Sequence, residues 1–238
     1  MKDPLAISLT AVSRAIEPNW LNEANDRFTT PWQMIKWPER NMLCVSQPRE
    51  DASSQTEQML VANVETGGWA RYTGWDAHSI CYFDGYGYFG TKGGEIFQME
   101  VGGYDDDQPY TAILVGQFSH FGKPGLDKTY LQSRAIFRAN GPLVYKVSGS
   151  VDYSIDVPDA PPAVSGFTSA VWDTAKWDVD VWDGGDLTTY SAVTYWRSIG
   201  REGYSYAPVI QITQGQDVAV SVEFLAAITT YRENGLVV

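Results

Sequence analysis

The sequence predicts an all-β protein. Aromatic residues make up 13% of the chain, with nine Trp and fourteen Tyr, and there are 22 glycines. From Met42 onward, short apolar runs alternate with turn-forming residues. Aromatic and β-branched side chains favour pleated strands, and glycine permits the tight turns between them. At 238 residues, the chain is long enough for one large β domain or two smaller ones, each with its own core.

Residues 1–40 lack the strand-and-turn pattern of the rest. Leu5 to Ile16 is compatible with a short helix or an irregular strand, and residues 19–36 carry tryptophans among polar residues. Pro31 and Pro38 mark loop positions. We therefore expect an irregular or short-helical N-terminal segment.

Residues 41–107 are predicted to form an antiparallel meander. Glu65-Thr66-Gly67-Gly68 closes a hairpin, and the glycines within 84–87 and 92–94 mark further turns. The expected strands are 42–47, 59–64, 69–73, 78–83, 88–91 and 95–100.

A weak internal repeat lies within this meander. The segment 59–64 precedes a Gly-Gly pair, and the segment 96–101, roughly 36 residues later, precedes another. This offset is close to the spacing of four-stranded blades in a β-propeller. The region holds at most two blades, whereas a closed propeller needs at least about four. We expect either that the sequence is a C-terminal fragment or that another chain completes the ring.

Residues 108–238 are predicted to form a β-sandwich platform. The acidic run Asp105 to Asp107 before it suits a linker or a solvated turn, because it lacks the later Glu and the glycine of a calcium loop. Val218, Val220 and Val222 alternate with other residues, as in a sheet with one buried face. The expected strands are 110–118, 129–139, 143–151, 192–198, 207–213 and 217–230.

An excursion at residues 156–189 interrupts the sandwich. It opens with the proline-rich segment 158–162, which cannot serve as a central strand. Trp172, Trp177 and Trp182 each precede an Asp and follow one another at steps of five, which alternate between the faces of a strand and so favour a loop arm. The indoles either anchor a neighbouring subunit, pack on the chain's own sandwich, or form a carbohydrate platform.

The charge distribution is uneven. A net charge of −12 argues against binding nucleic acid through phosphate neutralisation, which needs a basic surface. Residues 123–146 hold five basic and one acidic residue, whereas residues 147–238 hold twelve acidic and four basic ones. This asymmetry suits complementary docking of like subunits or, equally, independently solvated faces. The candidate interface cations are Lys123, Lys128, Arg134 and Arg138.

No catalytic motif stands out. His78 and His120 are the only histidines, no Gly-x-Ser-x-Gly elbow accompanies them, and no phosphate-binding glycine motif occurs. We expect a protein that is not an enzyme, with no catalytic residue, no metal and no cofactor. A glycosidase carboxylate pair stays open, because such pairs converge in space rather than in sequence.

The cysteines and the hydropathy bear on cellular context. Cys44 and Cys81 both lie in apolar, strand-like runs, which favours two buried free thiols over a disulfide or a metal site. The sequence predicts neither a cleaved signal peptide nor a membrane-spanning segment.

Several short motifs are distinctive when taken together: Trp37 to Met42, Gly74 to Ala77, Tyr88 to Thr91, Pro109 to Ala112, Gly122 to Gly125 and the Trp-Asp series at 172–183. They resemble motifs of the tail nozzle, or tail hub, proteins of short-tailed bacteriophages and related prophages. The similarity covers most of residues 35–200. It implies a β-propeller joined to a β-sandwich platform, with six copies forming a ring that extends the DNA ejection channel and helps retain the genome. This chain departs from that pattern in holding few blades.

The resemblance also implies partners and a location. The chain would contact itself in a homohexamer, the tail adaptor and the tail fibre proteins, and DNA would pass transiently through an acidic lumen. It would reside in the virion after assembly in the bacterial host cytoplasm. The alternative expectation is a glycan-binding receptor-recognition module of a virion or cell surface, with exposed aromatic side chains as stacking platforms.

Overall fold

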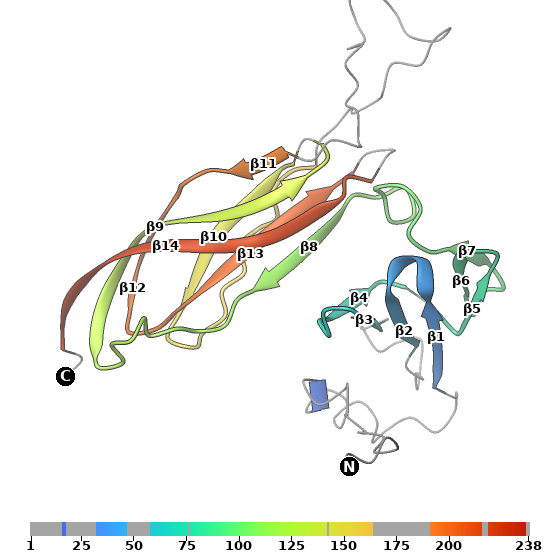
Figure 1. Ribbon diagram of the computed structural model, residues 1–238, viewed down its shortest axis with the longest axis horizontal. Coiled ribbons are helices and arrows are strands. Elements are labelled where there is room, and N and C mark those ends of the chain that lie inside the picture. The colour runs from blue at the N-terminus through green and yellow to red at the C-terminus, as the bar shows by residue number, and fades with distance from the viewer. Residues whose placement is uncertain are drawn as a thin grey trace, which may run out of the picture. The chain divides into compact units, whose positions relative to one another are not determined.

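The computed structural model divides into two compact units, Met1–Glu100 and Val101–Val238. In the described residues nearly all regular structure is antiparallel β, which confirms the predicted all-β class (Figure 1). A 3₁₀ turn covers Pro38–Arg40. No helix of the described part is long and apolar enough to cross a membrane. The structure describes residues 16–17, 32–46, 58–75, 77–141, 143–163, 191–215 and 219–236.

The first unit begins with a four-stranded antiparallel meander in the order β1-β2-β3-β4. Its first strand lies where the sequence predicted irregular structure. Alternation explains it, because Ile35 and Trp37 pack on the core whereas Met34 and Lys36 are exposed. The strands are β1 (Gln33–Trp37), β2 (Met42–Ser46), β3 (Gln58–Asn63) and β4 (Trp69–Thr73).

A second, three-stranded meander follows in the order β5-β6-β7. Asp84 and Gly85, with φ values of 49° and 86°, form the tight turn between β5 and β6. Two such residues suit the primed turns of hairpins. The predicted turn 84–87 was too long, since Tyr86 and Gly87 already belong to a strand. The strands are β5 (Ser79–Phe83), β6 (Tyr86–Gly90) and β7 (Ile96–Gln98).

The core of the first unit lies between these two meanders. Trp37 of β1 is buried, and its indole Nε1 donates a hydrogen bond of 3.0 Å to the carbonyl of Gly85. Gly87 lies beneath the same indole, where a Cβ would stand 2.9 Å from Cζ3. Phe89 stacks between Trp75 and Phe97, at ring distances of 5.1 and 5.3 Å. Burial of these large aromatic rings holds the two meanders together.

The second unit contains two antiparallel sheets. One has the order β10-β13-β8, and in the other β9 pairs with β14 along one edge and with β11 and β12 along the other. The single predicted strand 192–198 is two strands that break at Tyr195 and Trp196. The strands are β8 (Tyr110–Val115), β9 (Leu126–Ala139), β10 (Tyr145–Val151), β11 (Ser191–Thr194), β12 (Arg197–Gly203), β13 (Tyr206–Gln214) and β14 (Val222–Leu236).

Both sheets of the second unit contribute to one core. Phe137 of β9 contacts Tyr145 of β10 edge to face at 4.9 Å, and the buried cluster also contains Ala135, Val147 and Ile210. Figure 1 shows β9 and β14 as two long strands that curve together. Within this sheet, β11 and β12 pair with the opposite edge of β9.

Of the predicted excursion at 156–189, the structure describes residues 156–163, and these have no regular secondary structure. Trp172, Trp177 and Trp182 lie outside the described residues. Their predicted role at a subunit interface stays a prediction.

Candidate functional site

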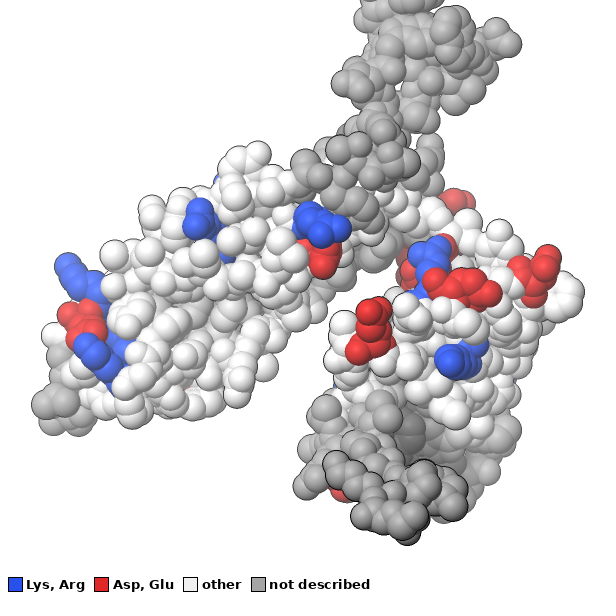
Figure 2. Space-filling model, viewed as in Figure 1, with Lys and Arg blue, Asp and Glu red and all other residues white. Residues whose placement is uncertain are grey.

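The predicted interface cations lie on or beside β9, and β14 supplies acids to two of them. Arg138 pairs with Glu223 at 3.3 Å, and Lys123 Nζ contacts Glu233 at 2.5 Å. Glu233 raises the pKa of Lys123 by hydrogen bonding and charge. The antiparallel pairing of β9 with β14 therefore mixes in space some charges that are segregated in sequence. Figure 2 shows that charged side chains are sparse on the visible face of this unit.

Lys128 is fully buried, with 0% of its surface exposed. Its Nζ donates to the carbonyls of Lys123, Leu126 and Tyr204, at 2.7, 2.8 and 3.1 Å. An ammonium group has three donors, and here each meets an acceptor. The predicted role of this side chain as a surface contact is thus not available to it, because it joins two loops of its own unit instead.

Arg134 lies beneath an aromatic residue rather than in a cationic patch. Its guanidinium stands 4.7 Å from the ring centroid of Trp196, within the range of a cation–π contact. Trp196 and the neighbouring Tyr195 are exposed, and the Tyr195 ring stacks with that of Tyr145 at 6.4 Å. Tyr195 and Trp196 thus form an exposed aromatic pair between the end of β11 and the start of β12.

The sheet of β5, β6 and β7 has one buried face and one exposed face. Ile80 and Phe89 face the core, so their neighbours in the pleat point the other way. On that outer side, Ile96 is 78% exposed and Phe83 70% exposed. We define the open face as Cys81, Phe83, Tyr86, Tyr88 and Ile96.

The open face is apolar and uncharged. The remaining outward positions of its strands are Ser79, Gly90 and Gln98, so none of them carries a charge. In the other meander, by contrast, Leu60 and Ala62 are buried although they point away from the shared core. The inner strand β3 of the first meander is thus buried on both faces, whereas the meander of β5 to β7 is buried on one.

The open face corrects one sequence prediction. Cys44 and Cys81 are both free thiols, but only Cys44 is buried. Burial, with a smaller contribution from Glu100, raises the pKa of Cys44 to about 11. Cys81 is exposed because the neighbouring Ile80 occupies the core side of β5. An apolar run therefore does not imply burial when a sheet leaves one face open.

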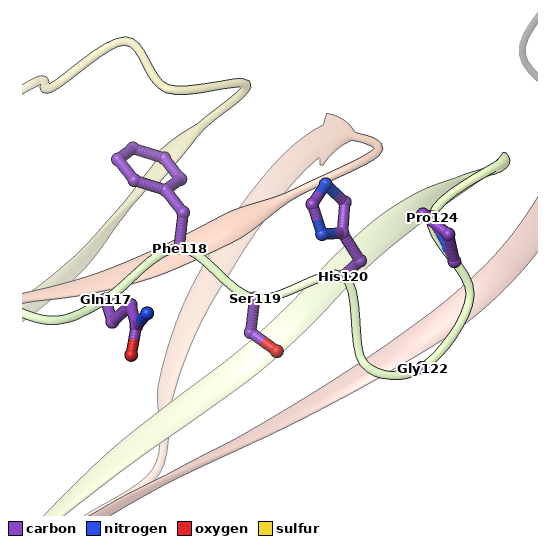
Figure 3. A pocket seen from close by; sticks show the side chains of 6 residues that line it. All are labelled: Gln117, Phe118, Ser119, His120, Gly122 and Pro124. Carbon is purple, nitrogen blue, oxygen red and sulfur yellow. The ribbon is translucent and has the colours of Figure 1, made fainter.

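A second candidate site lies at one end of the second unit, in the loop between β8 and β9. The loop borders an open hollow of about 470 Å³. In Figure 3 the rings of Phe118 and His120 project to one side of the loop, whereas Gln117 and Ser119 point to the other. The hollow is lined by Gln117, Phe118, Ser119, His120, Gly122 and Pro124.

Two further loops bring aromatic rings to the same place. Tyr153 packs on Phe118 at 4.9 Å, and its hydroxyl lies 3.3 Å from Nε2 of His120. The ring of Tyr204 stacks with that of His120 at 5.9 Å. We call Phe118, His120, Tyr153 and Tyr204 the Tyr153 cluster. Residues from three separate segments thus converge at one end of the unit.

Tyr153 is held outward by a strained turn. Asp152 and Tyr153 have φ values of 54° and 60°, a left-handed conformation that costs free energy in residues with a Cβ. The Asp152 carboxylate accepts hydrogen bonds from the backbone N–H groups of Tyr204 and Ser205, at 2.9 and 3.2 Å. Gly203 gives it room, since a Cβ there would stand 2.7 Å from Oδ1 of Asp152. The turn is therefore fixed by its neighbours.

The cluster offers binding chemistry. His120 and the tyrosines present polar atoms at the rims of apolar rings, the arrangement that recognises ligands with one apolar face and several hydroxyl groups. Ser119 Oγ accepts a hydrogen bond from the backbone N–H of Phe121 at 3.1 Å, so this hydroxyl already has a backbone partner. In the described part of the chain, no group of three or more His, Cys, Asp or Glu residues is placed to hold a metal ion.

No protein-family model matches the chain, and no curated protein matches it in sequence.

Proposed function

We propose that the chain is a structural virion protein, a subunit of the tail nozzle of a short-tailed bacteriophage or related prophage. In this proposal six copies form a ring that extends the DNA ejection channel and helps retain the packaged genome. The motifs that resemble nozzle proteins motivate the assignment. The open face of β5 to β7 is the structural observation that supports it most, because it gives the chain a surface that needs a neighbour.

The exposed side chains of the open face favour assembly. A contiguous apolar surface with no charged position on it is typical of the core of a protein–protein contact. The occupant we propose is a second copy of this chain. Each copy has a net charge of −12, and an interface without charged residues lets two copies meet with little local repulsion.

The size of the open face limits what it can do alone. Strand geometry makes β5 and β6 about 17 Å long and β7 about 10 Å, and with a spacing of about 4.8 Å the face is roughly 210 Å². A stable interface buries about 800 Å² per partner. The open face therefore contributes one part of a larger contact, as in a ring where each subunit offers two different surfaces to its neighbours.

The arrangement of strands is compatible with the nozzle pattern at a finer level. Each meander of the first unit is an up-and-down antiparallel sheet, the form of a propeller blade, and the repeated segments supply the third strand of each. The two sheets of the second unit, with their shared core, suit a sandwich platform. We propose that neighbouring copies supply the sheets that would complete the first unit.

The proposed mechanism is mechanical. A ring of anionic subunits presents a lumen that repels the phosphate backbone, so DNA slides through without being gripped. The tail adaptor and tail fibre proteins would be the other partners. The protein would reside in the virion after assembly in the host cytoplasm.

Electron microscopy and analytical ultracentrifugation of the purified chain test this proposal. We expect sixfold rings with a central channel. Ile96→Glu and Phe83→Glu place a charge on the open face and should shift the sedimentation profile to monomer. Val64→Glu, at another exposed apolar position in the first unit, should leave the rings intact. A monomer whose sedimentation is the same with and without Ile96→Glu would contradict the proposal.

A further inference from the structure

We propose that the Tyr153 cluster is a binding site for a neutral saccharide, with the Tyr153 ring as the stacking platform. This inference does not depend on the proposed ring. It concerns the end of the second unit where the loop after β8, the turn after β10 and the turn between β12 and β13 meet.

The first argument is the exposure of the platform. Tyr153 remains 57% exposed although it contacts two other aromatic side chains, Phe118 and His120. A residue that served only to fill a core would turn its ring inward. Here the backbone adopts a left-handed conformation that keeps the ring at the surface. Asp152 and Tyr153 are the central pair of a two-residue turn that is closed by a hydrogen bond from the Ser154 N–H to the carbonyl of Val151 at 3.0 Å, which fixes the position of Tyr153.

The second argument is that all three loops are fixed. Ser119 forms a two-hydrogen-bond antiparallel bridge with Tyr206, at 2.9 and 3.1 Å. Phe121, in a left-handed conformation, packs on Tyr231 at 4.9 Å. Lys128 joins the carbonyls of the first loop to that of Tyr204. A site held in place before its ligand arrives loses less entropy on binding.

The third argument concerns ligand chemistry. The electron-rich face of an aromatic ring attracts the polarised C–H groups on the apolar side of a pyranose, and ring-rim polar atoms bind its hydroxyl groups. The hollow of about 470 Å³ beside Phe118 and His120 lies within the size range of small-ligand sites. Asp152, which precedes Tyr153 and bonds the backbone of Tyr204, and the net charge of −12 disfavour phosphate-rich ligands. A neutral hexose or N-acetylhexosamine unit fits these features best.

The test uses the full chain and a panel of neutral hexoses, N-acetylhexosamines and their short oligomers, screened by saturation-transfer NMR and then titrated. The decisive variant is Tyr153→Asn, because asparagine tolerates the left-handed conformation and removes only the ring. We expect it to weaken binding of the selected saccharide by about tenfold, the effect of one lost aromatic contact. The matched control Tyr195→Asn removes an exposed tyrosine ring elsewhere in the same unit and should change binding less than twofold.

Three results would overturn the inference. One is no saccharide contact from any member of the panel. The second is equal affinity in wild type and Tyr153→Asn. The third is binding of peptides, but not of saccharides, that Tyr153→Asn abolishes. Circular dichroism and sedimentation of Tyr153→Asn verify the fold and the assembly, so failure of the proposed ring leaves the saccharide result interpretable.

Discussion

The ring of Tyr206 on β13 lies directly over the Cα of Gly149 on β10, so that a Cβ at Gly149 would stand 2.1 Å from Cε2 of Tyr206. Tyr206 is fully buried, stacks with Tyr130 at 4.6 Å and cannot move aside without disturbing that pair. The glycine is thus required by close packing rather than by a turn.

Gly149→Ala should therefore destabilise the fold by about 3 kcal/mol, the cost of strong overpacking in a core. Urea unfolding followed by tyrosine and tryptophan fluorescence measures this. The matched control is Gly125→Ala, where no atom lies within 4 Å of the added methyl group, and its effect should be within about 0.5 kcal/mol. Equal stabilities of the two variants would refute the packing argument.

Lys128→Met should destabilise the second unit by about 3 kcal/mol or more. The substitution removes the donor from three carbonyl groups, and buried acceptors left without a partner each cost free energy. Lys123→Met breaks only an exposed ion pair with Glu233 and should have a much smaller effect on stability. The urea midpoints of the two variants measure their losses of stability. A smaller loss for Lys128→Met than for Lys123→Met would show that the buried ammonium group does not stabilise the fold.

Alkaline pH should weaken the fold through Tyr130. Burial, with a smaller effect of Asp152, raises the pKa of Tyr130 to about 12, above the value of about 10 in an unfolded chain. The stability contributed by this phenol is fully present below pH 10 and is lost as the pH rises through 12. The expected loss is about 1 kcal/mol at pH 11.

Tyr130→Phe isolates this effect. The Tyr130 hydroxyl is buried without a hydrogen-bond partner in the described part of the structure, so its removal should change stability at pH 8 by less than about 1 kcal/mol. Between pH 8 and pH 11 the variant should lose less stability than wild type, measured by urea unfolding at each pH. The same loss in both proteins would assign the alkaline effect to other groups.

Thiol labelling should distinguish the two cysteines. A maleimide at pH 7.5 should label one thiol per chain in the dissociated native protein, Cys81, and two after unfolding. Cys44 is protected because it is buried and its pKa is raised to about 11. Cys81→Ser should abolish native labelling, and in an assembled ring Cys81 should be protected if a neighbour covers the open face. Rapid native labelling of Cys44 would contradict the packing of β2.

Much of the strand pattern could be predicted because its signals are local. Glycine pairs and Asp-Gly marked the hairpins, and these turns are present in the structure. β1 could not be predicted in the same way, because its alternation is only five residues long and ends at Pro38. The break at Tyr195 and Trp196 was also missed, since an aromatic pair is an ordinary strand sequence.

The candidate sites were harder to predict because they depend on partners distant in sequence. The members of the Tyr153 cluster come from residues 118 to 204, and no linear motif joins them. Pairing of β9 with β14 placed acids beside Lys123 and Arg138, which a count along the chain could not anticipate. The open face did leave a signal: Ile80, Cys81, Tyr82 and Phe83 are apolar in succession, so both faces of this strand carry apolar side chains.

The outer edge of β14 pairs with no described strand, although the strand is 15 residues long. A straight strand of this length would be a template on which other chains could grow into fibrils. Three register shifts interrupt its pairing with β9, and such irregularities bend and twist the backbone. These interruptions thus make the outer edge of β14 a poorer template for pairing with another chain than a regular strand of that length.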